Sequence, residues 1–348
     1  MIDDYDHSTI YVLFHFRYPP FQTNQKKRKT MSEQSDQEVE ETTINNEPEI
    51  DYKSGFVTFV GRPNVGKSTL FNAFMQQKLA IVSPRPQTTR TRMMGIITEP
   101  AYQMIFLDTP GLIKPRHKLD EFMVETAVET FDDADVILYM VDASQPVGAG
   151  DRAIAKQLAP LAGHVKIILG MNKGDELAFE DILPRTTEYR ALLPTADWIL
   201  FSATKGNGRD DLFQMLVDAL PPGPQYYPED QLTDVFVKDI AGELIREQIF
   251  LQLRDEIPYG TAVVVQEFKE RENGVTYISA NIYIERETHK RIIIGSNGKQ
   301  LQRIGKAARK EIEEIVDGKV FLDLFIKVEP KWRRNEKALK RLGYKTEG

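Results

Sequence analysis

Residues Gly61 to Ser68 read Gly-Arg-Pro-Asn-Val-Gly-Lys-Ser and match the phosphate-loop pattern G-x-x-x-x-G-K-[ST]. The loop follows a β-type run, Phe56–Val60, and precedes a helical pattern, Thr69–Gln77, which is the context the pattern requires. In such a loop the backbone N–H groups point at phosphate oxygens, and the start of the helix adds positive potential. We therefore expect Lys67 to reach the β- and γ-phosphates of a nucleotide and Ser68 to bind Mg²⁺.

A second motif, Asp108–Gly111 (Asp-Thr-Pro-Gly), directly follows an apolar run. An aspartate there would contact magnesium through bound water, and the Gly111 N–H could bond the γ-phosphate. The polar, proline-interrupted segment between residues 78 and 94 is typical of a switch loop, in which one threonine completes the magnesium shell. We favour Thr89 over its neighbour Thr88 for this role.

A third motif, Asn172–Asp175 (Asn-Lys-Gly-Asp), follows the next apolar run and predicts the choice of base. Guanine presents adjacent N1–H and N2–H₂ donors that one carboxylate can accept together, whereas adenine would leave that acceptor unpaired. Asp175 therefore indicates guanine selectivity, Lys173 can lie along the base, and Asn172 can join this loop to the phosphate loop. Ser202–Thr204 can offer backbone N–H groups to the guanine O6.

Leu112 occupies the position after Gly111, where Ras-like enzymes place a water-orienting glutamine. A leucine cannot orient water, so hydrolysis must depend on the backbone, a bridging water, a bound cation or a partner. The alternative is a protein that hydrolyses GTP poorly and acts mainly as a nucleotide-gated binder.

The second half of the chain contains a G-x-x-G turn, Gly295–Gly298, between an apolar run and a helical pattern from about Lys299 to Val316. This is the KH arrangement, in which the turn holds the backbone of single-stranded nucleic acid and an adjacent apolar groove holds bases. Residues 290–310 include seven basic and no acidic side chains, which supply phosphate affinity. A glycine turn on a solvated basic helix is the alternative interpretation.

The stretch Lys327–Lys345 is also basic, with eight Lys or Arg against two Glu, and it interleaves Trp332 and Tyr344. It could extend the nucleic-acid surface by cation contacts and stacking. It could equally form a solvated terminal helix, and both interpretations stay open.

The elements that must position these motifs alternate apolar β-type runs with helical patterns from Gly55 to about Leu220. Such alternation predicts an α/β domain with a mostly parallel sheet and helices on both faces. Its expected strands are Phe56–Val60, Gln103–Leu107, Val136–Val141, Lys166–Met171 and Trp198–Phe201. A smaller α+β unit follows, with a helix at Gly242–Glu256, strands at Thr261–Lys269 and Thr276–Glu285, the helix after the G-x-x-G turn, and a strand at Val320–Val328.

The composition is that of an intracellular globular chain of about two domains, with 348 residues and 41% hydrophobic residues. Zero cysteines exclude disulfide frameworks, cysteine-ligated metals and thiol nucleophiles, and no apolar stretch reaches the roughly 18 residues of a spanning helix. Residues 31–51 carry a local charge of −8 against −7 for the whole chain, so the remainder sums to +1. The acidic balance therefore does not exclude a nucleic-acid partner.

We predict five segments: a disordered acidic extension at 1–53, a GTPase domain at 54–220, a linker at 221–231, a type II KH domain at 232–330 and a basic segment at 331–348. One further hypothesis is that Met31 is the true start of the chain.

In this order, the motifs resemble the Era family of GTPases over about Gly55 to Tyr344, including Gln87–Arg90 (Q-T-T-R) and the ending Arg341–Tyr344 (R-L-G-Y). The resemblance implies a GTP-hydrolysing protein that uses GTP, GDP and Mg²⁺, binds the 3′ end of 16S rRNA and acts in processing and assembly of the small (30S) ribosomal subunit. It also implies a cytoplasmic protein that can associate peripherally with the inner membrane, and no DNA partner is expected.

Motifs and resemblance together assign the site residues. Catalytic roles are expected for Lys67, Thr89, Gly111 and Asn64, and magnesium contacts for Ser68, Thr89 and Asp108. The expected GTP-binding residues are Gly61, Arg62, Pro63, Asn64, Val65, Gly66, Lys67, Ser68, Thr69, Asp108, Thr109, Pro110, Gly111, Leu112, Asn172, Lys173, Asp175, Ser202, Ala203 and Thr204. The expected RNA-binding residues are Lys290, Arg291, Ile294, Gly295, Ser296, Asn297, Gly298, Lys299, Arg303 and Lys306.

Similarity to potassium-activated GTPases with an asparagine at this position suggests that the Asn64 carboxamide oxygen ligates K⁺, with carbonyls of Pro84–Thr89 completing the shell. Asn64 could instead merely stabilise its loop. Two other classes of function also stay open: an RNA-binding scaffold whose GTP is structural, and a relative whose second domain docks protein or membrane partners.

Overall fold

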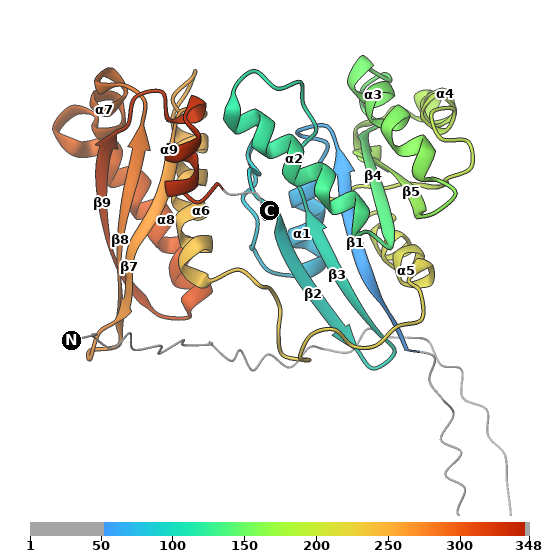
Figure 1. Ribbon diagram of the computed structural model, residues 1–348, viewed down its shortest axis with the longest axis horizontal. Helices are drawn as coiled ribbons and strands as arrows, with labels where there is room; N and C mark the ends of the chain where they lie inside the picture. Colours follow the sequence, from blue (N-terminus) through green and yellow to red (C-terminus); the bar gives the residue numbers. More distant parts are fainter. Residues whose placement is uncertain (1–51, 345–348) are drawn as a thin grey trace, which may run out of the picture.

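The computed structural model describes residues 52–344, which form two domains side by side (Figure 1). The expectations for residues 1–51 of the acidic extension, including the Met31 hypothesis, lie outside the described residues. The predicted end of that extension at residue 53 is wrong, because Lys53 begins the first strand and pairs with Tyr102. Between Tyr52 and Tyr344, no helix is both long enough and apolar enough to cross a membrane.

The first domain is built on a six-stranded sheet in the order β2-β3-β1-β4-β5-β6. Its strands are β1 (Lys53–Gly61), β2 (Met93–Glu99), β3 (Tyr102–Asp108), β4 (Val136–Asp142), β5 (Lys166–Asn172) and β6 (Asp197–Leu200). Every neighbouring pair is parallel except β2 with β3. The predicted, mostly parallel sheet is confirmed, and the antiparallel edge strand β2 is an addition that the sequence analysis missed.

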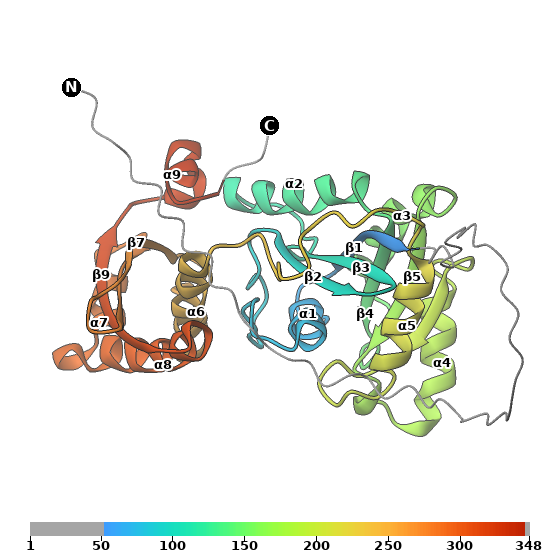
Figure 2. The same cartoon turned by 90° about the horizontal axis from the view of Figure 1, so that it is seen from below.

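Helices cover both faces of this sheet, and α1 and α2 lie on opposite sides of it in Figure 2. One face packs against α1 (Lys67–Met75) and α5 (Arg209–Ala219), which contribute the buried side chains Leu70, Phe71 and Leu212. The other face packs against α2 (Lys118–Asp132), α3 (Ala149–Leu158) and α4 (Phe179–Arg190). The parallel strands are therefore buried on both sides, as their continuous apolar runs require.

The predicted linker (221–231) and the two residues after it, which were predicted to begin the KH domain, run along the first domain and bond to strands β2 and β3. Ile96 N–H donates to Leu232 O at 2.8 Å, and the Thr233 hydroxyl donates to Met94 O at 2.6 Å. The Gln103 side-chain oxygen accepts from the N–H groups of Tyr226 and Tyr227. These bonds satisfy backbone groups of the otherwise unpaired edge strand. They also hold the chain in place just before the first helix of the second domain.

The second domain is a three-stranded sheet, β7-β8-β9, with helices α6 (Val237–Gln252) and α8 (Lys299–Val316) packed on one face. Strand β7 (Ala262–Glu270) is antiparallel to β8 (Val275–Ile284), which is parallel to β9 (Lys319–Val328). The apolar run before the G-x-x-G turn is helical, as α7 (Glu287–Ile294). This confirms the smaller α+β unit.

The C-terminal segment holds the two domains together. Its short helix α9 (Glu336–Arg341) lies beside the start of α2 in both views (Figures 1 and 2), and Phe122 of α2 packs in one apolar cluster with Trp332, Leu339 and Tyr344. The Trp332 and Tyr344 rings are buried and stack 5.7 Å apart. The stacking expected of Trp332 and Tyr344 is therefore wrong, because their rings are buried, and the helix is not merely solvated, because its apolar side packs against the start of α2. Cation contacts of this segment with nucleic acid stay a prediction.

Candidate functional site

The three nucleotide motifs meet at one edge of the six-stranded sheet because each follows the carboxyl end of a parallel strand. The phosphate loop follows β1, Asp108 ends β3, Asn172 ends β5, and Ser202 follows β6. In open parallel sheets this edge is where ligands bind.

Asn172 joins three loops of this edge. Its Nδ2 donates to Val65 O at 2.8 Å, and its Oδ1 accepts from Ala203 N–H at 2.9 Å, so the expected link to the phosphate loop is confirmed. Gly66 has a φ of +102°, and a Cβ there would lie 2.2 Å from Asn172 Nδ2, so only glycine fits.

The same bonds correct one expectation about the base. The Ala203 N–H is used by Asn172, and the Ser202 N–H donates to Asn207 O at 2.9 Å, so neither is available to the guanine O6. The Thr204 N–H has no partner within residues 52–344 and is the remaining donor of the three. The motif alone could not reveal this, because one acceptor, Asn172 Oδ1, comes from another loop and the other, Asn207 O, depends on how the loop after β6 turns back on itself.

Lys67 is a buried cation without a carboxylate contact. Its Nζ donates to Gly61 O and Arg62 O, both at 3.1 Å, inside the phosphate loop. Burial lowers the pKa of Lys67 to about 8, against the opposing effect of Asp108. An anion placed beside Lys67 would offset this desolvation, which is what the phosphates of a nucleotide supply. The Arg62 side chain instead pairs with Asp151 at 2.7 Å, so only the Arg62 backbone belongs to the loop.

Three oxygen-bearing side chains gather below the phosphate loop. Ser68 Oγ lies 2.8 Å from Thr89 Oγ1 and donates to Asp108 Oδ2 at 2.7 Å. Asp108 is fully buried, its Oδ1 has no hydrogen-bond partner among the described residues, and burial raises its pKa to about 6. A buried, incompletely satisfied carboxylate beside two hydroxyls suits a hard cation such as Mg²⁺. The Thr88 hydroxyl instead donates to Arg85 O, so the structure brings Thr89, not Thr88, to this cluster.

The loop after β3 runs against the phosphate loop. A Cβ at Gly111 would lie 2.6 Å from the Pro63 nitrogen, and Leu112 N–H donates to Gly61 O at 3.2 Å. The Leu112 side chain packs on the apolar cluster that includes Ile154 and Leu158 of α3, and it carries no polar group that could orient water. Asn64 Nδ2 donates to Pro84 O at 2.8 Å, which places its side chain beside a carbonyl of the switch loop and is the bond expected if Asn64 stabilises its loop.

At the base end, Asp175 is exposed in a short turn, Gly174–Glu176. Its carboxylate makes no hydrogen bond or ion pair with another residue of the described chain and is therefore free to accept from a base. Lys173 adopts a φ of +65° and pairs with Asp142 at 2.5 Å.

In the second domain, the predicted turn has the geometry that its glycines permit. Gly295 and Gly298 adopt φ values of +70° and +76°, and Ser296 and Asn297 are exposed between them. A Cβ at Gly295 would lie 2.6 Å from Gln300 Cβ. The predicted basic residues flank the turn, from α7 (Lys290 and Arg291, with Ile294 half-buried beside them) and from α8 (Lys299, Arg303 and Lys306).

A groove of about 590 Å³ runs from this turn between α8 and β9. Gly298 and Lys306 line it, as does Arg309 of the basic block. The opposite wall, formed by Phe321, Leu322 and Leu324, was not predicted from the sequence, because only the parallel pairing of β9 with β8 brings these residues near the turn. We call this cavity the KH groove.

Two residues of the switch loop reach into the second domain on either side of Thr89. Thr88 O accepts from the buried Arg246 of α6. The Arg90 guanidinium is buried and donates to Thr261 O at 2.7 Å, Tyr259 O at 2.9 Å, Pro258 O at 3.3 Å and Tyr344 Oη at 3.2 Å. Earlier in the loop, Lys78 pairs with Glu247 at 2.5 Å and with Glu311 at 2.6 Å. None of these contacts was expected from the sequence.

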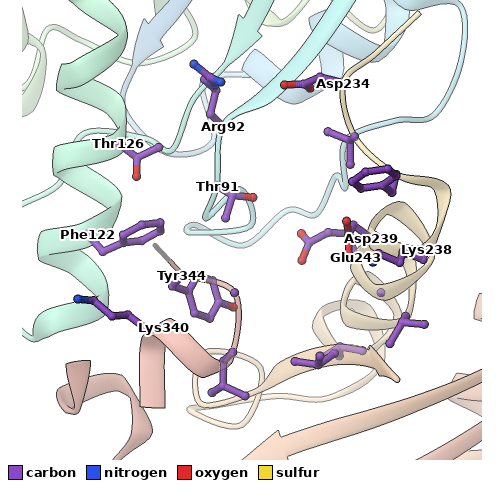
Figure 3. Close-up of a pocket in the computed structure, with 18 of the residues that line it drawn as sticks. Thr91, Arg92, Phe122, Thr126, Asp234, Lys238, Asp239, Glu243, Lys340 and Tyr344 are labelled. Atoms are coloured by element: carbon purple, nitrogen blue, oxygen red, sulfur yellow. The ribbon is translucent and has the colours of Figure 1, made fainter. Parts of the chain in front are cut away.

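The domains also enclose a cavity of about 770 Å³ beside these contacts (Figure 3). Thr91 and Arg92 of the switch loop, Phe122 of α2, Glu243 of α6 and Tyr344 line its walls. The domain interface is therefore anchored at a few points and open between them.

Comparison with known protein families gives two matches. The family described as "50S ribosome-binding GTPase" matches residues 56–173, and the KH domain family matches residues 256–333. Among curated proteins, GTPase Era of Halothermothrix orenii is 48% identical over 298 residues, which cover 85% of this chain and 100% of that protein. GTPase Era of Ruminiclostridium cellulolyticum is 48% identical over 297 residues, covering 85% and 99%.

Two solved structures are similar over the same extent. An Era structure in complex with MgGDPNP and nucleotides 1506–1542 of 16S ribosomal RNA has a TM-score of 0.81 and 37% identity, and the match covers 85% of this chain and 100% of that one. A point variant of Aquifex aeolicus Era bound to GDP·AlF4⁻ also has a TM-score of 0.81 and 37% identity, with 84% and 100% covered.

Proposed function

The chain belongs to the Era family of GTPases, and on that premise we propose that it couples a GTP cycle to binding of the 3′ end of 16S rRNA during processing and assembly of the small (30S) ribosomal subunit. Guanine nucleotide with Mg²⁺ is the ligand of the first domain. The name of the matching GTPase family mentions the large subunit, but that match stops at residue 173. The KH domain and the RNA present in the similar Era structure favour the small-subunit RNA.

The proposed coupling between the nucleotide site and the second domain rests on one observation, which is that Thr88, Thr89 and Arg90 are consecutive residues. The Thr89 hydroxyl lies at the Ser68–Asp108 cluster, while both neighbours bond to the second domain. Threonine at this point is released and re-ordered as the γ-phosphate leaves and returns in switch loops. A movement of Thr89 therefore alters the contacts of its neighbours with the second domain, made by Arg246 and Arg90. A movement of the second domain alters the position of Thr89 in the same way.

The chemistry assigned to the first domain depends on positioning and charge. The phosphate loop and Lys67 would hold the β- and γ-phosphates, and the Gly111 N–H would bond the γ-phosphate. Bound Mg²⁺ would neutralise charge on the phosphates, held by Ser68 and Thr89 with Asp108 behind them. Because Leu112 carries no polar group that could orient water, we also propose that K⁺ assists hydrolysis, ligated by Asn64 and switch carbonyls; the position of Asn64 beside Pro84 O supports this.

The chemistry assigned to the second domain is that of a KH groove. The exposed turn would hold the RNA backbone, the basic side chains of α8 would contact phosphates, and the apolar wall of β9 would receive bases. We further propose a cytoplasmic location with peripheral attachment to the inner membrane; fractionation of cells, followed by a salt wash of the membranes, tests it.

The proposed function is tested by crosslinking the protein to RNA in cells and sequencing the bound fragments. Crosslinks concentrated at the 3′ end of 16S rRNA, and lost in a Ser296→Asp/Asn297→Asp variant, are expected. Crosslinks concentrated in large-subunit RNA, or spread without preference, would contradict it.

A further inference from the structure

The sheet of the second domain has a face that its own helices do not cover. Helices α6 and α8 bury one face, which includes Ile278 and Val320. On the other face the C-terminal segment covers only one end, where Val264 and Tyr283 pack against Trp332 and its neighbours. Beyond this cover, on the edge strand β9, Phe325 lies in the same register row as Val264 and is 49% exposed, and Phe321, four residues further from the covered end, is 50% exposed.

Two aromatic rings of this face, those of Tyr277 and Phe321, stack on each other. Tyr277 of β8 pairs in register with Phe321 of β9, and their rings stack 6.0 Å apart at 25°. The Arg271 guanidinium lies 4.4 Å from the Tyr277 ring centre and 5.5 Å from that of Phe321. The Tyr277 hydroxyl donates to Asp323 at 3.1 Å, which fixes the ring. We call Arg271, Tyr277, Phe321 and Phe325 the aromatic platform.

Such a face is unusual for an open sheet, whose solvent side normally carries polar residues in alternation with the core. Two half-exposed phenylalanines on one strand face leave apolar area in water, at a cost of roughly 25 cal/mol per Å². Clustered exposed apolar residues commonly mark a binding surface.

The platform is continuous with the KH groove. Phe321 belongs to the platform and also lines the groove, because β9 is the edge strand and its side chains reach both sides of the edge. Alternation along the strands puts Lys319 and Lys327 of β9 and Lys269 of β7 on the platform face, with Arg271 next to them. Glu267 and Asp323 are the acidic residues on that face, so basic side chains predominate.

We propose that the aromatic platform binds bases of single-stranded RNA by stacking, so that an RNA strand leaving the KH groove passes over the β9 edge and continues onto the outer face of the sheet. The proposal rests on the proposed RNA binding of the groove. Aromatic rings on a sheet face stack bases in several RNA-binding domains, with little dependence on base identity. Arg271 adds cation contact to the stack, and the surrounding lysines contact phosphates.

The test uses Phe325, which belongs to the platform but does not line the groove. Two RNA oligonucleotides of small-subunit 3′-end sequence are compared: one of four nucleotides, which is about the length that a KH groove holds, and one long enough to pass beyond it. Phe325→Ser should weaken binding of the long RNA by about 5- to 150-fold, the equivalent of one stacked base at about 1–3 kcal/mol. Binding of the short RNA should not change.

Two further variants make the result specific. Phe179→Ser removes a phenylalanine that is 89% exposed on α4 of the other domain and should affect neither RNA. Phe325→Trp should keep the affinity for the long RNA, and its tryptophan emission should be quenched by the long RNA and not by the short one.

The failures of the two proposals are distinguishable. If Phe325→Ser leaves the affinity for the long RNA unchanged while Ser296→Asp/Asn297→Asp reduces it, the platform is wrong and the groove stands. If Phe325→Ser weakens both RNAs equally, the effect is on the domain as a whole, and the platform is also wrong. If the wild-type protein binds neither RNA, the proposed function itself fails.

Discussion

Replacing Arg90 by Ala should selectively weaken binding of the triphosphate form of the nucleotide. Arg90 follows Thr89 and is anchored in the second domain by four hydrogen bonds and by the rings of Phe250 and Trp332, at 5.9 and 5.8 Å. Hydrogen bonds to a charged group contribute about 1.5–3 kcal/mol each and cation–π contacts about 0.5–1 kcal/mol. Against this, the guanidinium is buried without a carboxylate partner, and burial lowers the pKa of Arg90. Desolvation of the guanidinium offsets much of the free energy of these contacts. We therefore take about 2–4 kcal/mol as the net free energy with which they hold Arg90 in the second domain.

Part of that anchoring holds Thr89 at the magnesium cluster before the nucleotide arrives. Without it, binding of the triphosphate must order the backbone of at least one residue, which costs about 1–2 kcal/mol. At 1.4 kcal/mol per factor of ten, the affinity for GDPNP should fall about 5- to 30-fold. GDP has no γ-phosphate and does not use Thr89, so its affinity should change by less than about threefold.

The measurement is a calorimetric titration of GDPNP and of GDP, each with Mg²⁺, into the wild type, Arg90→Ala and Arg92→Ala. Arg92 is the matched control, since it lies two residues further along the same loop and its side chain makes no hydrogen bond or ion pair within residues 52–344. Arg90→Lys keeps the charge without the guanidinium fork and should lie between wild type and Arg90→Ala. An equal loss of GDP and GDPNP affinity in Arg90→Ala, or no loss of either, would refute the reasoning.

The remaining predictions concern base choice, RNA binding and the monovalent ion. Asp175→Asn should relax selectivity towards XTP, because an amide N–H₂ suits the C2 carbonyl of xanthine; competition binding of GTP and XTP measures it, and an unchanged preference for GTP would reject the role of Asp175. Ser296→Asp/Asn297→Asp should weaken single-stranded rRNA binding by at least about tenfold and leave GTP affinity intact, as measured by filter binding and nucleotide titration, since two anions would face the RNA backbone. GTP turnover should be faster in KCl than in NaCl at equal ionic strength, and Asn64→Ala should remove that advantage; equal wild-type rates in both salts would defeat the potassium proposal.

The motifs of the nucleotide site could be predicted because each is a short contiguous string after a buried strand, and parallel strands bring such strings to one edge. Strand β2 was missed because its pattern is interrupted by Gly95 and its pairing with β3 is antiparallel. That glycine is required by packing: a Cβ there would lie 2.6 Å from Met75 Sδ.

What could not be predicted depends on contacts between residues far apart in the sequence. The local sequence around Arg90 does not indicate whether its side chain is buried or exposed. The carbonyls that accept its hydrogen bonds lie 168 to 171 residues further along the chain. Trp332 and Tyr344 look like a stacking surface until α2 covers them. The outer wall of the KH groove likewise appears only when β9 pairs with β8.

Measuring the RNA affinity of the protein in two nucleotide states tests whether the switch loop couples the nucleotide to RNA binding. In the structure, Thr89 is at the magnesium cluster while the KH groove is open, so the account predicts tighter binding of a 16S 3′-end RNA with GDPNP than with GDP. Coupling between sites is typically about 1–3 kcal/mol, or about 5- to 150-fold, and must appear equally as RNA-enhanced affinity for GDPNP. Arg90→Ala should reduce the ratio of the two RNA affinities towards one. Equal RNA affinities of the wild-type protein in the two nucleotide states would contradict the account.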